Sequence, residues 1–143
     1  MKKILPIIAI FVAFYVAWSQ LNHQGDPVAL TGQNDEIFAN AFEQGKSGIQ
    51  AEGEGTVIKI LPDDNDGSRH QRFILRLDSG QTLLMAHNID LAPRVSSLNE
   101  GDGVEFYGVY EWNSKGGAIH WTHHDPNNRH VAGWLQHSGK TYQ

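Results

Sequence analysis

Five of the eight histidines lie between positions 120 and 137, close to an aspartate at position 125. Neutral imidazole is the commonest metal ligand, and a carboxylate can complete a zinc-like ligand set without cysteine. In an extended strand His120 and His124 would stand about 13 Å apart at 3.3 Å per residue, which is too far for one ion. The candidate ligands for a divalent metal such as zinc are therefore His123, His124, Asp125 and His130. The alternative is that these residues contact a ligand or hold the C-terminal tail on the domain.

A second group of candidate residues follows from the alternation of side chains around position 73. Phe73, Leu75 and Leu77 are expected to face a core, which turns Arg72 and Arg76 outward. Guanidinium groups bind phosphate or carboxylate, and tryptophans stack on a base or a sugar ring. The predicted ligand-binding residues lie on this outward face or at its ends: Arg69, His70, Arg72, His87, Asn88, Trp112, His120 and Trp121. Cross-strand pairing of the arginines with acidic residues is the alternative.

The composition removes several classes of protein from consideration. The chain has 143 residues, of which 40% are apolar and 19% are charged, and it contains no cysteine. This length suits one domain with an N-terminal extension. The lack of cysteine excludes disulfide scaffolds, thiolate zinc sites and cysteine nucleophiles. The sequence has no Gly-x-Ser-x-Gly, P-loop or dinucleotide-binding motif, so serine hydrolases, nucleotide kinases and Rossmann enzymes lose their usual support.

Residues 1–19 are predicted to be a signal peptide or an N-terminal membrane anchor. Lys2 and Lys3 precede an uncharged apolar run from Ile4 to Trp18, as in export signals. As a helix this run would reach only about 22 Å, short of a ~30 Å hydrocarbon core, which favours cleavage over a stable anchor in the inner membrane. In either case the rest of the chain is expected outside the cytoplasm, in the periplasm of a Gram-negative cell.

The charge balance also bears on the partners. The formal net charge is −5 from 11 basic and 16 acidic residues. Removing Lys2 and Lys3 would leave 11 − 2 = 9 basic residues and a charge of −7. Such a charge opposes non-specific binding to nucleic acid, although it allows a local basic strip.

One short helix is predicted before the strands, after a linker over residues 20–34 that is rich in turn-forming residues. Asn34 is expected to cap this helix, Asp35 and Glu36 to complement its dipole, and Gly45 to end it. Its apolar stripe is expected to comprise Ile37, Phe38, Ala41 and Phe42.

Five strands are predicted within residues 35–143, at 56–61, 70–78, 81–87, 104–111 and 118–123. Gly53 and Gly55 suggest a bend before the first strand. This order predicts a mainly β fold, a small five-stranded OB-like Greek-key barrel with one N-terminal helix and a C-terminal tail. Ligands of OB barrels commonly bind on strands two and three and at the turns that here span residues 62–68 and 111–117.

Over residues 36–143 the chain resembles an uncharacterised bacterial family of short exported proteins, grouped as a domain of unknown function. The resemblance is carried by RHQRF at 69–73, AHNIDLAPR at 86–94 and HWTHHDP at 120–126, together with His130, Gly133 and Trp134. It implies membership of that family and no particular chemistry.

Three functions remain open at this point, and whether the protein is an enzyme is one of the open questions. The first is an exported, periplasmic OB-like binding module for an anionic or ring-bearing ligand, such as a nucleotide, an oligonucleotide or a glycan. The second is a metal-dependent phosphodiesterase or nuclease that uses the histidine-rich segment 120–130. The third is an envelope protein-interaction module with a patch formed by Trp134 and Tyr142.

Overall fold

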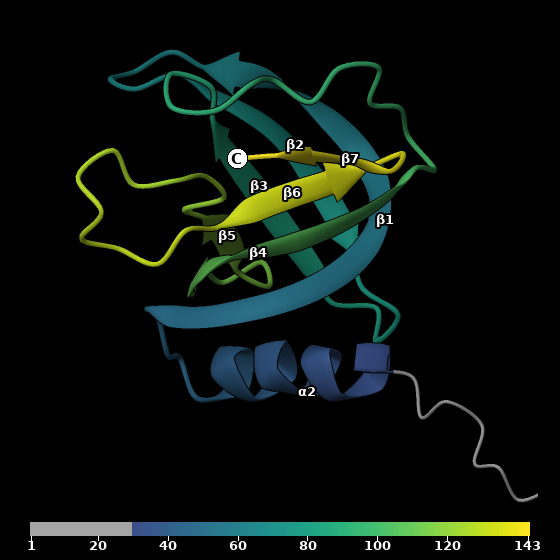
Figure 1. Cartoon of the computed structure of the whole chain (residues 1–143). Coiled ribbons are helices and arrows are strands. Elements are labelled where there is room, and N and C mark those ends of the chain that lie inside the picture. The colour runs from purple at the N-terminus through teal and green to yellow at the C-terminus, as the bar shows by residue number, and fades with distance from the viewer. Residues whose placement is uncertain (1–29) are drawn as a thin grey trace, which may run out of the picture. The chain divides into compact units, whose positions relative to one another are not determined.

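The computed structural model describes residues 30–143, with side chains from Asn34 onward. The predicted signal peptide or anchor at 1–19 and the predicted linker up to residue 29 lie outside the described residues. One helix and seven strands follow in this order: α2 (Leu30–Glu43), β1 (Ile49–Asp64), β2 (His70–Arg76), β3 (Thr82–Asn88), β4 (Gly103–Glu111), β5 (Ala118–His120), β6 (Trp134–His137) and β7 (Lys140–Tyr142) (Figure 1). Within residues 30–143 no helix is both long enough and apolar enough to cross a membrane.

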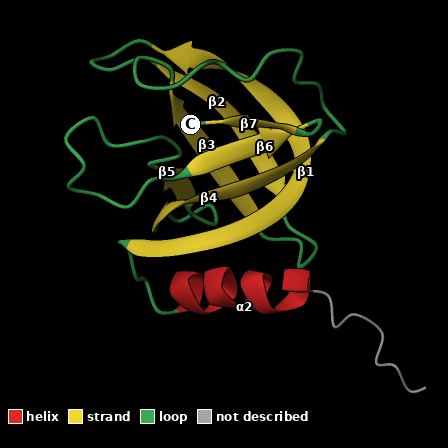
Figure 2. Ribbon diagram, in the orientation of Figure 1, coloured by secondary structure: helices red, strands yellow, loops and turns green. Residues whose placement is uncertain are grey.

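The expectation of a mainly β fold is confirmed, because all seven strands belong to one mixed sheet with the helix beside it (Figure 2). The strand order is β1-β2-β3-β5-β4-β6-β7, and β1 also pairs with β4, so the pairings from β1 through β2, β3, β5 and β4 return to β1. Only β3 and β5 pair in parallel, over two residue pairs. The sheet therefore contains the five expected strands and two more from the C-terminal tail.

Strand β1 makes this circuit possible because it has two neighbours in succession. Residues from Ile49 to Thr56 pair with β4, and residues from Thr56 to Asp64 pair with β2. Strand β1 changes its pairing partner at Thr56, directly after Gly55, where a bend was expected. A Cβ atom on Gly53 would lie 2.7 Å from the ring of Phe106 and 2.8 Å from that of Phe38. Glycine at this position therefore lets α2 pack directly on the strand.

Helix α2 begins earlier than expected, at Leu30, so the predictions that Asn34 caps the helix and that Asp35 and Glu36 lie in its first turn are wrong. The carboxylate of Asp35 instead accepts a hydrogen bond of 2.8 Å from the backbone N–H of Ser79. This bond fixes the helix to the β2–β3 turn. A tertiary contact therefore explains the aspartate at position 35, although aspartate is also typical of the start of a helix.

The apolar stripe of α2 is only half buried. Phe38 and Ala41 lie in the core, whereas Ile37 and Phe42 remain exposed. The helix ends at Glu43, and Gly45, which was expected to end it, follows in a turn with a φ of 62°, the left-handed conformation favoured by glycine. The helix therefore packs on the sheet through Phe38 and Ala41, which are half of its predicted apolar stripe.

The core lies on the inner face of the sheet, where alternate residues of β2 and β3 are buried. The predicted inward set of Phe73, Leu75 and Leu77 is confirmed, since none exceeds 2% exposure. The rest of the core includes Leu83, Met85, Val104, Phe106, Tyr110, Ile119 and Leu135. Because inward and outward residues alternate, Arg72 and Ile74 point away from this core.

Two predictions about the C-terminal third are wrong. Strand β5 ends at His120 because Trp121 has a φ of 56°, which takes the chain out of the extended conformation. The tail forms the hairpin of β6 and β7, joined by Ser138 and Gly139, both with positive φ. Two consecutive residues of positive φ are typical of the tightest hairpin turns, so this tail adds two strands to the sheet.

Candidate functional site

A hollow of about 340 Å³ lies on the outer face of β1, β2 and β3, next to the turn between β4 and β5. We call it the basic hollow, because three of its side chains are cationic and none is acidic. Its lining is Lys59, Leu61, Arg72, Ile74, Thr82, Leu84, Asn113, Lys115 and Gly117. Its volume is at the lower end of the range for small-molecule sites.

Strand register explains why these side chains meet. Lys59 pairs with Ile74, and Ile74 pairs with Leu84, so these three residues form one row across the sheet. Leu61 pairs with Arg72 in the adjacent row. Residues paired across antiparallel strands point to the same face, so both rows lie on the outer surface and supply the apolar floor and two of the cations.

A backbone carbonyl holds the guanidinium of Arg72 in place. Its Nε donates a hydrogen bond of 3.0 Å to the carbonyl of Pro62. In the part of the chain that the structure describes, the four ion pairs involve other residues, so neither Arg72 nor Lys59 nor Lys115 is neutralised by a carboxylate. Three unpaired cations around one hollow favour an anionic ligand.

The turn over residues 113–117 supplies the third cation and is firmly anchored. The side-chain oxygen of Asn113 accepts hydrogen bonds from the backbone N–H groups of Lys115 at 2.9 Å and Gly117 at 3.0 Å. The hydroxyl of Thr82 donates to the carbonyl of Lys115 at 3.1 Å. Gly117 has a φ of 111°, and a Cβ there would collide with the ring of Tyr110. The hollow is therefore built on a turn whose backbone is fixed before any ligand binds.

Of the predicted ligand-binding residues, only Arg72 lines the basic hollow. Arg69 forms an ion pair of 2.7 Å with Asp90, in the loop after β3. His70 Nδ1 donates to the carbonyl of Ser68 at 2.8 Å. The side-chain oxygen of Asn88 accepts from the backbone N–H of Asp90 at 2.9 Å. These residues organise the ends of β2 and β3.

His87, which was predicted to contact a ligand, does not line the basic hollow, and its side chain is buried with only 1% exposure. Its Nε2 donates to the carbonyl of Pro93 at 2.9 Å, which leaves Nδ1 to accept from the hydroxyl of Thr122 at 2.7 Å. Burial lowers the pKa of His87 to about 4, against the opposing effect of the Pro93 carbonyl. His87 is therefore a neutral structural residue at neutral pH.

The side chains of Trp112 and His120 make contacts within the domain. The indole N–H of Trp112 donates to the carbonyl of Phe42 at 3.1 Å, and the two rings stack with their centroids 6.3 Å apart. His120 Nε2 donates to Glu111 at 3.2 Å. Trp112 thereby fastens the end of α2 to the end of β4, and neither residue lines the basic hollow.

Trp121 and the predicted metal ligands belong to one loop after β5. The indole ring of Trp121 stacks on the rings of His123 and His130, with centroids 5.0 and 4.0 Å away. The carboxylate of Asp125 accepts hydrogen bonds from three backbone N–H groups, and these bonds lower the pKa of Asp125. His123 and His130 each donate from Nδ1 to a nearby backbone carbonyl, and His124 is exposed.

This arrangement matches the structural alternative for the histidine-rich segment. Among residues 34–143, no group of three or more histidine or acidic side chains is placed so that it could hold a metal ion. The polar atoms of the segment hold the loop closed.

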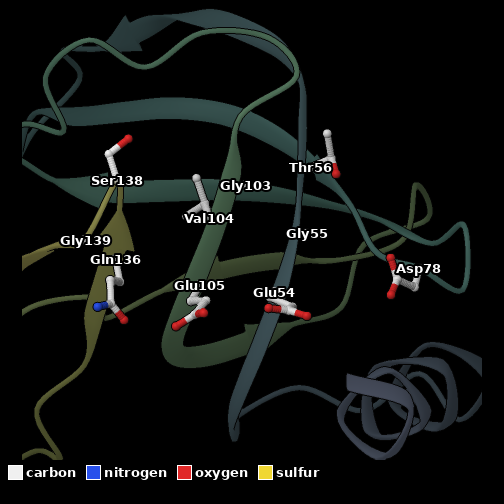
Figure 3. Close-up of a pocket in the computed structure, with 10 residues that line it drawn as sticks. All are labelled: Glu54, Gly55, Thr56, Asp78, Gly103, Val104, Glu105, Gln136, Ser138 and Gly139. Carbon is white, nitrogen blue, oxygen red and sulfur yellow. The ribbon is translucent and has the colours of Figure 1, made fainter. Parts of the chain in front are cut away.

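A second hollow, of about 440 Å³, carries the opposite charge and was not predicted from the sequence (Figure 3). We call it the acidic hollow: Glu54 and Glu105, which are register partners on β1 and β4, line it together with Asp78. Partial burial and the nearby carboxylates, Glu105 before Asp78, raise the pKa of Glu54. Paired carboxylates on adjacent strands repel an anion, so this hollow cannot serve the ligand that fits the basic one.

These features define a small, mainly β domain with a basic hollow on the outer face of its sheet. Residues 20–143 match the family described as "Protein of unknown function (DUF3465)", and the chain belongs to this family. The resemblance to an uncharacterised family is thereby confirmed. A comparison with curated proteins finds no match.

Proposed function

We propose that the domain is an OB-like binding module that takes a small anionic ligand in the basic hollow. The circuit of pairings from β1 through β2, β3, β5 and β4 supports an OB-like ring of five strands. In OB barrels the ligand face is commonly strands two and three with the turns beside them. The basic hollow occupies the corresponding place, on β2, β3 and the β4–β5 turn.

The observation that carries this proposal is the combination of three cations and no carboxylate in one hollow of a chain with net charge −5. Arg72 adds a planar donor group that suits bidentate contact with a phosphate or carboxylate.

The lining also favours binding over catalysis. It contains no histidine, cysteine, serine or acidic side chain, and these are the usual general bases and nucleophiles. Its one hydroxyl, on Thr82, already donates to a backbone carbonyl. The hollow therefore has groups suited to hold an anion, and Lys59 and Lys115 are the remaining side chains in its lining of a type that can act as a base or nucleophile.

The same proposal includes export to the periplasm, on the evidence of the charged and apolar pattern in residues 1–19. Fusion of residues 1–25 to a reporter that folds only outside the cytoplasm tests this part separately. An inactive reporter would refute export and leave the binding proposal intact.

The binding proposal is tested by calorimetric titration of the purified protein with butyl phosphate. Arg72→Gln should weaken binding by about 10- to 100-fold, since a hydrogen bond to a charged group contributes roughly 1.5–3 kcal/mol. Arg76→Gln is the matched control, because it removes the same charge from the same strand and the residue does not line the hollow. Equal effects of the two substitutions, or no binding by the wild type, would refute the proposal.

A further inference from the structure

We infer that the ligand of the basic hollow is a single-chain anionic amphiphile, whose head binds the three cations and whose alkyl chain lies on the apolar floor. This inference rests on the proposed function and narrows the class of ligand. It comes from three observations: the floor of the hollow, the positions of the aromatic residues, and a neighbouring hollow beside α2.

The floor is apolar although it lies on the outer face of the sheet. Leu61, Ile74 and Leu84 are all half-buried there. Ile74 and Leu84 are register partners, and Leu61 lies in the adjacent row opposite Arg72. Outward positions on a one-sided sheet are usually polar. Three large aliphatic side chains beside three cations suit a ligand that has both an apolar part and a negatively charged part.

The positions of the aromatic residues argue against a nucleotide. Bases bound without sequence readout are usually stacked on aromatic side chains, and the lining of the basic hollow contains none. Trp112 stacks on Phe42, and Trp121 stacks on His123 and His130. An aliphatic floor offers contact to an alkyl chain and no ring on which a base could stack.

A third hollow can take the end of a longer alkyl chain. It measures about 400 Å³ and lies between α2 and the β4–β5 turn, where Ala39 and the exposed ring of Phe42 line it. Thr82 and Lys115 line both hollows. An alkyl chain that outgrows the basic hollow can therefore pass over the turn, along Thr82 and the aliphatic stem of Lys115, toward Phe42.

The experiment compares butyl phosphate with octyl phosphate, both below the concentrations at which they form micelles. A methylene moved from water to an apolar site improves affinity about fourfold. Four added methylenes on a half-open floor should therefore tighten binding by about tenfold or more. Octyl glucoside, with the same chain and no charge, should bind at least about tenfold more weakly than octyl phosphate, because it cannot use the cations.

Two variants assign this effect to the floor. Ile74→Thr should remove at least about threefold of the advantage of octyl phosphate, because the lost apolar contact matches roughly one methylene. The same variant should leave butyl phosphate within about twofold of wild type. Ile60→Thr is the matched control, since Ile60 is 44% exposed on β1 and does not line the hollow. Every variant retains the apolar run of residues 4–18, so any binding of the amphiphile to that run is the same in the wild type and in all variants.

The outcomes separate this inference from the proposed function. Equal affinity for the two phosphates, with a loss in Arg72→Gln, would overturn the amphiphile and leave the anion site. The amphiphile would likewise be overturned, and the anion site kept, if a nucleotide or a vesicle of anionic lipid binds through Arg72 and octyl phosphate does not. Chain-dependent binding that ignores both Arg72→Gln and Ile74→Thr would overturn both proposals, as would the absence of binding by every probe.

Discussion

Acid should destabilise this protein through one buried histidine. His87 makes two hydrogen bonds that require its neutral form, with Nε2 protonated toward Pro93 and Nδ1 accepting from Thr122. A second proton on Nδ1 would break the bond to Thr122 and place a charge in a site with 1% exposure. The native state therefore resists protonation at a pH where the unfolded chain accepts it.

The size of the effect follows from the two pKa values. Burial lowers the pKa of His87 from 6.5 to about 4 in the folded protein. Between these values the unfolded state binds more protons than the native state, so stability is full above pH 6.5 and falls as the pH drops toward 4. Each pKa unit corresponds to about 1.36 kcal/mol, so the full loss is about 3 kcal/mol.

Urea denaturation followed by far-ultraviolet circular dichroism measures this loss across the pH range. The wild type should lose about 3 kcal/mol of unfolding free energy between pH 6.5 and 4. His87→Gln should start less stable but show a much shallower decline, because glutamine does not titrate. His124→Gln, at an exposed position, is the control and should keep the wild-type slope. Equal slopes for wild type and His87→Gln would refute the reasoning.

Three acidic residues with lowered pKa values act below this window, whereas Glu54, whose pKa is raised, adds stability as the pH falls and does so equally in the wild type and in His87→Gln. Hydrogen bonds to backbone N–H groups lower the pKa of Asp102 and Asp125, and hydrogen bonds from Arg69 lower that of Asp90. A carboxylate with a lowered pKa contributes stability that is lost only as the pH falls below the ordinary value of 3.8. Their effect therefore begins where that of His87 is nearly complete.

Three further predictions concern packing and the loops. Gly53→Ala should destabilise the protein by about 1–3 kcal/mol, because the added Cβ meets the ring of Phe106, whereas Gly103→Ala enters open space and should cost under about 1 kcal/mol in the same urea assay. Asp125→Asn should speed amide hydrogen exchange in residues 127–133 by about tenfold, because it weakens three charge-assisted hydrogen bonds; unchanged exchange would contradict this. Trp112→Phe should cost about 1 kcal/mol, the usual contribution of one hydrogen bond, and a larger loss in thermal unfolding would point to a different role.

Local patterns predicted much of the sheet. Strands β2, β3 and β4 lie near their expected bounds because their side chains alternate and glycine-containing turns separate them. The hairpin of β6 and β7 was missed because its strands are short, although Ser138 and Gly139 form a recognisable turn pair. The early end of β5 had no such signal, because a tryptophan in the left-handed conformation is held there by tertiary contacts.

The candidate site was predicted only in part, for a related reason. The alternation of side chains placed Arg72 on the outer face. The similarity of the strand order to that of OB barrels placed the β4–β5 turn beside it. Lys59 could not be placed by alternation, because that pattern would put it on the same face as the core residue Val57, and the register shift between Val57 and Lys59 turns it outward. The roles of Trp112 and His87 could not be predicted, because their hydrogen-bond partners Phe42 and Thr122 are 70 and 35 residues away in sequence.

The separation of charge on the domain bears on the size of ligand it can accept. Lys59 in the basic hollow and Glu54 in the acidic hollow lie on the same strand, five residues or about 16 Å apart at 3.3 Å per residue. A small anion can occupy the basic hollow without approaching the acidic one. A polyanion that ran along β1 from the basic hollow would meet Glu54 and its neighbours, where like charges raise its free energy. Under the proposed function, this arrangement favours a single charged head over an oligonucleotide that runs along β1, on grounds independent of the apolar floor.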